Sequence, residues 1–186
     1  SLYGQMKLLA EREVLKAGGD FATVLRIPIL NGNSPHGQRS VHEKLLMQLA
    51  AGNRPVLFTN ELRQPLGVSN LAELVTELVE RPNLHGIFHW AGQDVLSRAE
   101  MGLAILRHFG LPETLVETQE CTDPTRPLDL RFELAPLVSK VRTTPMPFAE
   151  QLTELSLPPA LSKWYAEVTG KAPTIQLPRL IKGKDF

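Results

Sequence analysis

The sequence predicts an α/β fold in which helices cover a largely parallel β-sheet. Between residues 3 and 110, segments with helical apolar periodicity alternate with short runs of β-branched and aromatic residues. Glycines and prolines separate most of these segments. The chain has 186 residues, 42% of them hydrophobic, which is enough for one globular domain with a sizeable core. Such alternation is typical of βαβ units.

The first part of the alternation begins with a helix over residues 3–18. The β-rich run 21–27 follows and is expected to be a buried strand that ends at Pro28, because proline cannot donate to a strand ladder. Residues 30–37 are dense in turn formers and predict a loop. A second helix is expected over residues 40–51.

The second part repeats this order. Residues 55–58 predict a short strand, and Ser69 is a suitable N-cap for a helix that runs to about Arg81. Residues 85–92 are strand-like and bounded by glycines. Ser97 then begins another helix, with Glu100 in the position that completes a capping box.

Beyond Pro112 the regularity fades. The expected elements there are a strand at 115–118, a loop at 122–130, helices at 152–155 and 160–168, and an extended tail over 171–186.

The charge balance excludes several classes of partner. The chain has 20 Lys and Arg against 20 Asp and Glu, so it lacks the basic surplus of a general nucleic-acid binder. It also lacks an apolar run long enough to cross a membrane, and no leader for export is evident. Cys121 is the single cysteine, so an internal disulfide is impossible and a cytoplasmic location is expected.

Tyr3 and Lys7 are the first candidates for chemistry. Residues four apart lie on the same face of a helix. An ammonium group lowers the pKa of a nearby phenol, which can then exchange a proton with a carbonyl oxygen during hydride transfer. Lysine also supplies donors for the hydroxyls of a cofactor ribose. The same spacing occurs by chance in many helices, where it is an exposed aromatic beside a solvated charge.

Further segments carry a resemblance. Tyr3-Gly4-Gln5-Met6-Lys7 with Glu11 resembles the Tyr-Gly-x-x-Lys segment of extended short-chain dehydrogenases/reductases, and Val24-Leu25-Arg26 before Gly32 looks like that family's strand. Gln64 to Ala72 resembles the loop that enters its "Asp-Leu-Ala" helix, with Asn70 in place of aspartate. Gly86 to Gly92 resembles the dTDP-4-dehydrorhamnose reductase branch, which includes the regulatory β subunit of methionine adenosyltransferase. Arg126-Pro127 is similar to a late segment of the same branch.

The resemblance covers about residues 1–150 and implies roles for five residues. Tyr3 would be the general acid, and Lys7 its partner and ribose ligand. Pro28 would lie beside the nicotinamide of NAD or NADP. Arg63 would face the diphosphate of a nucleotide-linked sugar, and Arg26 either shares that role or serves as a structural residue at the strand end.

The resemblance also implies parts that these residues do not contain. The Gly-x-x-Gly-x-x-Gly turn for the pyrophosphate, the first strands of the sheet and a catalytic Ser or Thr belong upstream of residue 1. Residues 1–155 are therefore expected to be the C-terminal catalytic-helix and substrate-binding portion of a Rossmann-like fold, with a small mixed subdomain. Residues 156–186 are expected to add a helix and a tail. Such a chain should be inactive alone and bind cofactor weakly or not at all.

Two alternatives to a reductase stay open. One is a regulatory or binding subunit with a protein partner, and the other is a piece that forms a homodimer through an exposed sheet edge.

Other candidates for chemistry are weaker. The five histidines form no ligand motif, so no metal site is expected. No Gly-x-Ser-x-Gly elbow indicates a hydrolase. Cys121 is expected to be inert, His89 and Trp90 to fill the flank of the sheet, and Trp164-Tyr165 to pack their helix onto the body.

Overall fold

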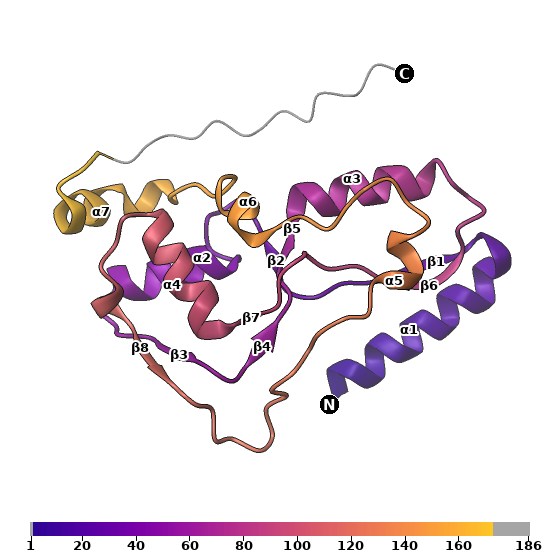
Figure 1. Cartoon of the computed structure of the whole chain (residues 1–186), viewed down its shortest axis with the longest axis horizontal. Helices are drawn as coiled ribbons and strands as arrows, with labels where there is room; N and C mark the ends of the chain where they lie inside the picture. Colours follow the sequence, from indigo (N-terminus) through magenta and orange to yellow (C-terminus); the bar gives the residue numbers. More distant parts are fainter. Residues whose placement is uncertain (1, 173–186) are drawn as a thin grey trace.

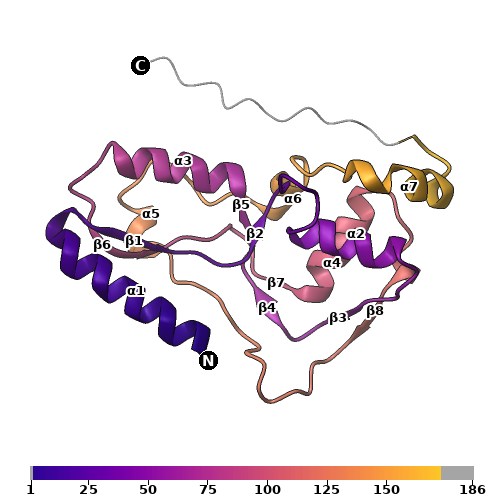
Figure 2. The ribbon, with the colours of Figure 1, turned by 180° about the vertical axis from the view of Figure 1, so that it is seen from behind.

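The computed structural model describes residues 2–172 and consists of two groups of elements with a short connecting layer between them (Figures 1 and 2). One group contains α1 (Leu2–Gly18), β1 (Thr23–Arg26), α3 (Val68–Val79), β6 (Gly86–His89) and α5 (Ala135–Val138). The other contains α2 (Val41–Ala50), β3 (Val56–Phe58), α4 (Arg98–His108), β8 (Glu117–Gln119) and α7 (Ser162–Thr169). The connecting layer contains β2 (Leu30–Asn31), β4 (Leu62–Arg63), β5 (Leu66–Gly67), β7 (Leu96–Ser97) and α6 (Phe148–Leu152). Single 3₁₀ turns lie at Gly19–Phe21, Glu113–Leu115 and Pro159–Leu161.

The strands pair in twos, and most pairs are parallel. β1 pairs with β6, β2 with β5, and β3 with β8, all parallel, whereas β4 and β7 are antiparallel. Parallel strands require a crossover connection, and the helices between the paired segments supply it. The predicted α/β class is therefore confirmed.

Each group has its own hydrophobic core. In the first, α3 packs against β6 through Leu74, Phe88 and the fully buried Trp90, and Leu137 of α5 closes the core. In the second, α2 and α4 pack against each other, and the buried members of this core are Leu45, Leu46, Leu49, Met101, Ile105, Leu106, Phe109, Leu111, Val116, Phe148 and Leu155. The predicted packing of Trp90 is confirmed.

Most predicted elements are present with small shifts, but the helix expected at 152–155 spans Phe148–Leu152 instead, and the loop expected at 30–37 begins with β2. The predicted capping box of Ser97 and Glu100 is present at the start of α4, and Ser40 with Glu43 forms another at α2. Ser69 was expected to cap α3, but the cap residue is Gly67 and Ser69 lies inside the helix. Its hydroxyl instead donates to Glu154 Oε2 at 2.5 Å, a partner 85 residues away that local sequence does not reveal.

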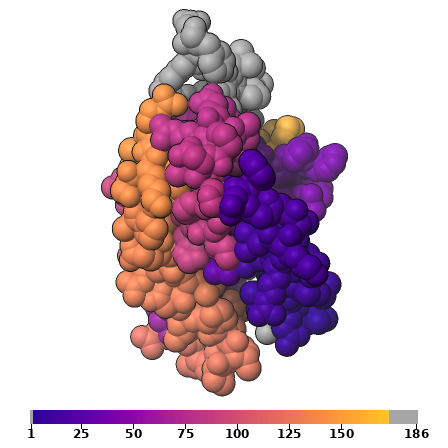
Figure 3. Space-filling model, turned by 90° about the vertical axis from the view of Figure 1, so that its right-hand side faces the viewer, coloured from indigo at the N-terminus to yellow at the C-terminus, as the bar shows by residue number. Residues whose placement is uncertain are grey.

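α1 is the least covered helix of the described chain. None of its residues is buried, and Tyr3 is 73% exposed. The space-filling view shows it as an outer flank of the molecule (Figure 3). A two-pronged ion pair fixes it to β1, because Arg26 donates through Nε to Glu11 Oε1 at 2.9 Å and through Nη2 to Oε2 at 2.7 Å.

The last described helix, α7, packs on the second core. Trp164 and Tyr165 are partly buried against that core, as predicted, and the Tyr165 hydroxyl donates to the carbonyl of Phe109 at 2.9 Å. Residues 173–186, which hold most of the predicted extended tail, lie outside the described residues. The division at residue 155 stays a prediction. No described helix is long and apolar enough to cross a membrane.

Candidate functional site

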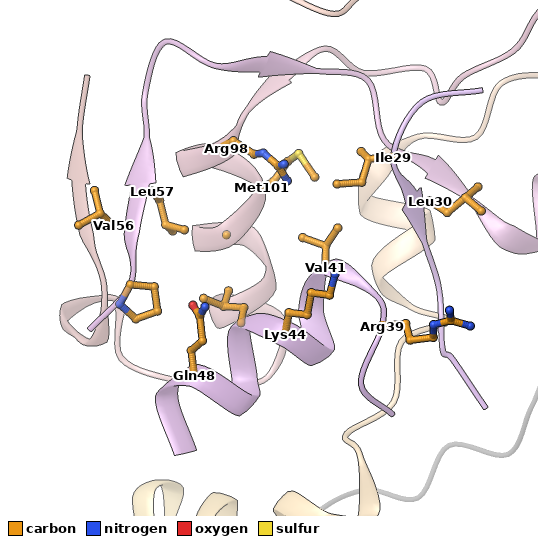
Figure 4. A pocket seen from close by; sticks show the side chains of 13 residues that line it. Ile29, Leu30, Arg39, Val41, Lys44, Gln48, Val56, Leu57, Arg98 and Met101 are labelled. Atoms are coloured by element: carbon orange, nitrogen blue, oxygen red, sulfur yellow. The ribbon is translucent and has the colours of Figure 1, made fainter. Parts of the chain in front are cut away.

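The candidate site is a pocket of about 470 Å³ in the second group of elements. Its walls come from the β1–β2 connection, α2, β3 and the first turn of α4 (Figure 4). The apolar part of the lining consists of Ile29, Leu30, Val41, Leu45, Pro55, Val56, Leu57, Met101 and Gly102. Gly102 lets the Leu57 side chain approach the helix, because a Cβ there would lie 2.3 Å from Leu57 Cδ1.

The polar part of the lining is basic. Arg39, Lys44 and Arg98 contribute three positive charges, Gln48 contributes an amide, and no acidic side chain lines the pocket. Figure 4 shows Arg98 and Met101 from α4 facing Val41 and Lys44 from α2 across the pocket. Apolar walls beside a few cations suit a ligand that carries both a flat or aliphatic group and a negative charge.

A buried carboxylate organises the loop that leads to Arg39 and Lys44. Glu43 accepts hydrogen bonds from the main-chain N–H groups of Ser34, Arg39 and Ser40, at 2.6, 2.7 and 2.9 Å, and from the Ser34 hydroxyl at 2.6 Å. Burial raises the pKa of Glu43, but these hydrogen bonds outweigh it and hold the pKa below its ordinary value. The loop that carries Arg39 is thereby fixed to the start of α2.

A second buried carboxylate lies behind Arg98. Glu61 is fully buried and contacts Arg126 Nε at 2.5 Å, Arg63 Nη2 at 3.4 Å and Arg98 Nε at 3.8 Å. Burial raises the pKa of Glu61, and the three guanidinium groups more than offset this, so the net direction is down. Burial is also the main cause that lowers the pKa of Arg98.

The structure places the five residues predicted from sequence in two regions. On α1, the Lys7 ammonium lies 5.6 Å from the centre of the Tyr3 ring, and both side chains are exposed. Arg26 pairs with Glu11, which agrees with the alternative that it is a structural residue at the strand end. Pro28 follows β1 and is half-buried. Figure 1 shows α1 on the other side of the connecting layer from α2 and α4, with its N-terminal end, which carries Tyr3 and Lys7, toward the middle of the molecule. The structure therefore brings Lys7 next to Tyr3 and Arg26 next to Glu11 of the same helix, and none of the three predicted residues lines the pocket.

Arg63 lies in the other region and faces the protein interior. It is 7% exposed and donates to the carbonyls of Leu62, Pro127 and Leu128 at 2.7, 3.1 and 3.3 Å. It thus holds the Arg126-Pro127 segment against β4. Its predicted role toward a diphosphate stays a prediction.

Sequence reasoning missed the residues that line the pocket and the carboxylate behind them. Arg39, Lys44 and Arg98 come from three separate segments, and each has the pattern of an ordinary surface charge. Glu61 carried one usable signal, which is an acid two residues before Arg63, a residue that the resemblance assigns to substrate binding.

The remaining candidates do not form a site. Among residues 2–172, no group of three or more His, Cys, Asp or Glu side chains could hold a metal ion. Cys121 is buried, and its N–H and carbonyl both bond to the Asn60 amide, which gives it a structural setting. His89 is half-buried and its ring lies 4.9 Å from that of Phe132.

Comparison with solved structures defines the class of fold. A dTDP-4-dehydrorhamnose reductase from Clostridium acetobutylicum superposes with a TM-score of 0.66 at 19% identity, covering 83% of this chain and 54% of the other. A dTDP-glucose 4,6-dehydratase from Bacillus anthracis, solved in complex with NAD, gives a TM-score of 0.66 at 12% identity and covers 82% and 51%. The fold is therefore that of Rossmann-like reductases and epimerases.

Sequence comparison then gives the family. The sequence pattern described as "RmlD substrate binding domain" matches residues 1–156, and the chain belongs to this family. Methionine adenosyltransferase 2 subunit beta from Xenopus tropicalis is 32% identical over 119 residues, which are 61% of this chain and 35% of that protein. A probable low-salt glycan biosynthesis reductase from Haloferax volcanii is 30% identical over 127 residues, 67% of this chain and 42% of that protein. The chain thus spans less than half the length of these relatives.

Proposed function

We propose that this chain is the nucleotide-sugar-binding portion of an NAD(P)-dependent reductase or epimerase. The observation that carries the proposal is the basic pocket within the region that matches the family. Its apolar walls suit a base and sugar, and Arg39, Lys44 and Arg98 suit a diphosphate. Arg63 would support the diphosphate from behind, next to the Arg126-Pro127 segment that it anchors.

Within the whole protein, Tyr3 and Lys7 would serve the chemistry. Their side chains are exposed on one face of α1, so a cofactor and a keto sugar could reach them. When bound, the nicotinamide would supply hydride to the carbonyl carbon of the sugar. Tyr3 Oη would give its proton to the carbonyl oxygen, while Lys7 would hold the ribose hydroxyls and keep positive charge beside the phenol. Pro28 would contact the nicotinamide at the end of β1.

The experiment is a calorimetric titration of the chain with dTDP, thymidine and NADPH. The proposal predicts that dTDP binds more tightly than thymidine, and that Lys44→Ala weakens dTDP without changing thymidine. Met47→Ala is a control that changes an exposed residue of the same helix outside the pocket lining. NADPH is expected to bind weakly or not at all to this chain. Binding of NADPH without dTDP, or binding of neither nucleotide, would contradict the proposal.

A regulatory subunit is the second candidate, and the similarity to methionine adenosyltransferase 2 subunit beta favours it. This role predicts a stable complex with the methionine adenosyltransferase of the same organism. Size-exclusion chromatography with light scattering on the mixed proteins would detect it, and the chain alone would show whether it forms the predicted homodimer. Separate elution of the two proteins, combined with nucleotide binding in the pocket, would favour the reductase role.

A further inference from the structure

The cluster around Glu61 contains more arginines than are needed to offset the charge of one buried carboxylate, and they are arranged around it in a specific way. One carboxylate faces the guanidinium groups of Arg63, Arg98 and Arg126. The exposed Asp129 and Asp123 also act on Arg63 and Arg126, whereas Glu61 is the acid that acts on Arg98, so the positive surplus falls on Arg98. An unpaired buried carboxylate would be very unfavourable, but fewer cations would be enough to offset it. The surplus lies directly behind the pocket, because Arg98 belongs to both the cluster and the pocket lining.

The way in which Glu61 holds two of these arginines is specific. One carboxylate oxygen contacts Nε of Arg126 and the other approaches Nε of Arg98. The Arg98 contact is an ion pair at 3.8 Å, longer than a hydrogen bond, with Glu61 at the Nε end of the guanidinium, and Figure 4 shows the Arg98 side chain at the pocket. Arg63 differs, since its Nη groups donate to main-chain carbonyls and thereby fix the Arg126-Pro127 segment.

Glu61 also fixes Arg98 through the main chain. The Glu61 carbonyl accepts a hydrogen bond from the N–H of Arg98 at 3.0 Å. Arg98 is the first residue of α4, directly after the capping Ser97, so its backbone is held from both sides. Glu61 thus fixes the main chain of Arg98 through this hydrogen bond and contacts the Nε end of its guanidinium through the ion pair.

We propose that Glu61 is a positioning residue that presents the Nη groups of Arg98 to the phosphate of a nucleotide in the pocket. The Arg126 contact keeps the Glu61 carboxylate from rotating. Because the positive charge around Glu61 is in surplus, the charge of Arg98 is not fully neutralised and can attract the phosphate. The inference rests on the proposed function, because it assumes that a phosphate enters this pocket. It adds to the proposed binding residues Glu61, which does not line the pocket itself.

The test compares dTDP and thymidine binding in the wild-type chain, Glu61→Gln and Arg98→Lys. Glutamine fills the same space, but its amide offers N–H groups where Arg98 or Arg126 needs an acceptor. Since charge-assisted hydrogen bonds are at stake, dTDP affinity should fall by about tenfold or more in E61Q, with thymidine affinity unchanged. R98K keeps the charge and loses the Nε donor, so it should lose a similar factor. The double variant should bind dTDP no more weakly than the weaker-binding single variant, because both substitutions disrupt the same Glu61–Arg98 arrangement.

Glu113→Gln is the matched control, because Glu113 pairs with Nε of Arg107 at 2.5 Å outside this pocket. It should leave both affinities unchanged. Tighter dTDP binding in E61Q would overturn the proposal, because it would mean that Glu61 only neutralises charge. Equal loss of thymidine would overturn it as well, because that indicates a collapsed pocket. If E61Q does not fold, R98K decides alone, and wild-type dTDP affinity in that variant refutes the idea.

The outcomes separate the two proposals. A wild-type chain that binds neither nucleotide removes both. A wild-type chain that prefers dTDP, with E61Q and R98K behaving like it, keeps the proposed function and removes the role of Glu61.

Discussion

Replacing Glu77 with glutamine should remove one of the larger polar contributions to the stability of this chain. Glu77 lies on α3 with its side chain 6% exposed. It accepts hydrogen bonds from the N–H groups of Arg142 and Thr143 at 2.7 and 2.8 Å, and from the Thr143 hydroxyl at 2.8 Å. Arg81 adds an ion pair at 3.0 Å. The carboxylate thereby fixes the segment after α5 onto α3.

The size of the effect follows from the pKa. Burial raises the pKa of Glu77, but the N–H groups of Arg142 and Thr143, the Thr143 hydroxyl and then Arg81 outweigh it and lower the value from 4.5 to about 2. That fall corresponds to about 3 kcal/mol of added stability for the folded state with Glu77 charged. Because the folded pKa is depressed, this stability is present above pH 4.5 and is lost as the pH falls toward 2.

The assay is urea unfolding of the wild type and Glu77→Gln at pH 7, 5, 4 and 3. At pH 7 the variant should be less stable by about 2–3 kcal/mol, since glutamine leaves a buried N–H without an acceptor. The gap should narrow at pH 4 and 3. Glu80→Gln is the control: Glu80 is 41% exposed and only approaches Arg142 at 3.5 Å, so its loss should cost less than about 0.5 kcal/mol. A gap that is absent at pH 7, or that does not change with pH, would refute the reasoning.

Three further predictions concern the second core and the connecting layer. His42 is fully buried, and burial is the main cause that lowers its pKa; His108 lowers it further, whereas Glu43 and the Ser156 carbonyl raise it. Because protonating His42 disfavours the folded state, stability should decline as the pH drops below about 6.5. Thermal unfolding of His42→Phe should show a flatter profile between pH 5 and 7, and a slope equal to that of the wild type would contradict this. Gly92→Ala should destabilise the chain by about 3 kcal/mol or fail to fold, because its Cβ would lie 2.0 Å from the Pro65 carbonyl oxygen; an unchanged Tm would disprove that close approach. Tyr165→Phe should cost about 1 kcal/mol in urea unfolding through loss of the hydrogen bond to Phe109, and no change would mean that α7 contributes only apolar contact.

Sequence predicted best the features whose causes are local. α4 is an example, because Ser97 and Glu100 form their capping box within one turn and any sequence with that spacing favours it. Asn70 shows the opposite case. Its amide donates to the Thr144 carbonyl at 2.9 Å and its oxygen accepts from Trp90 Nε1 at 3.1 Å. An aspartate could not donate the hydrogen bond to the Thr144 carbonyl. The reason for an asparagine in place of the family's aspartate therefore lies 74 residues away in the sequence.

The candidate site was harder to predict for the same reason. β2 and β5 are two-residue strands whose pairing no periodicity can reveal, yet they place Ile29 and Leu30 at the pocket. Arg98 was recognisable as a helix residue but not as a pocket residue, because that depends on α2 and β3. The family resemblance supplied Tyr3 and Lys7 through an order of motifs, which is information that pocket geometry does not contain.

The parallel pairs also set the order in which this chain can fold. Thr23 of β1 pairs with Gly86, and Val56 of β3 pairs with Glu117, so these two pairs cannot form until a long stretch between their strands has been synthesised. Forming such distant pairs closes large loops before any contact compensates for the lost entropy, which slows folding. During translation, β1 and β3 would leave the ribosome before β6 and β8, their partners in these pairs. A chain truncated before residue 117 would keep α2 and α4 but lose the strand that completes β3, and we expect it to aggregate.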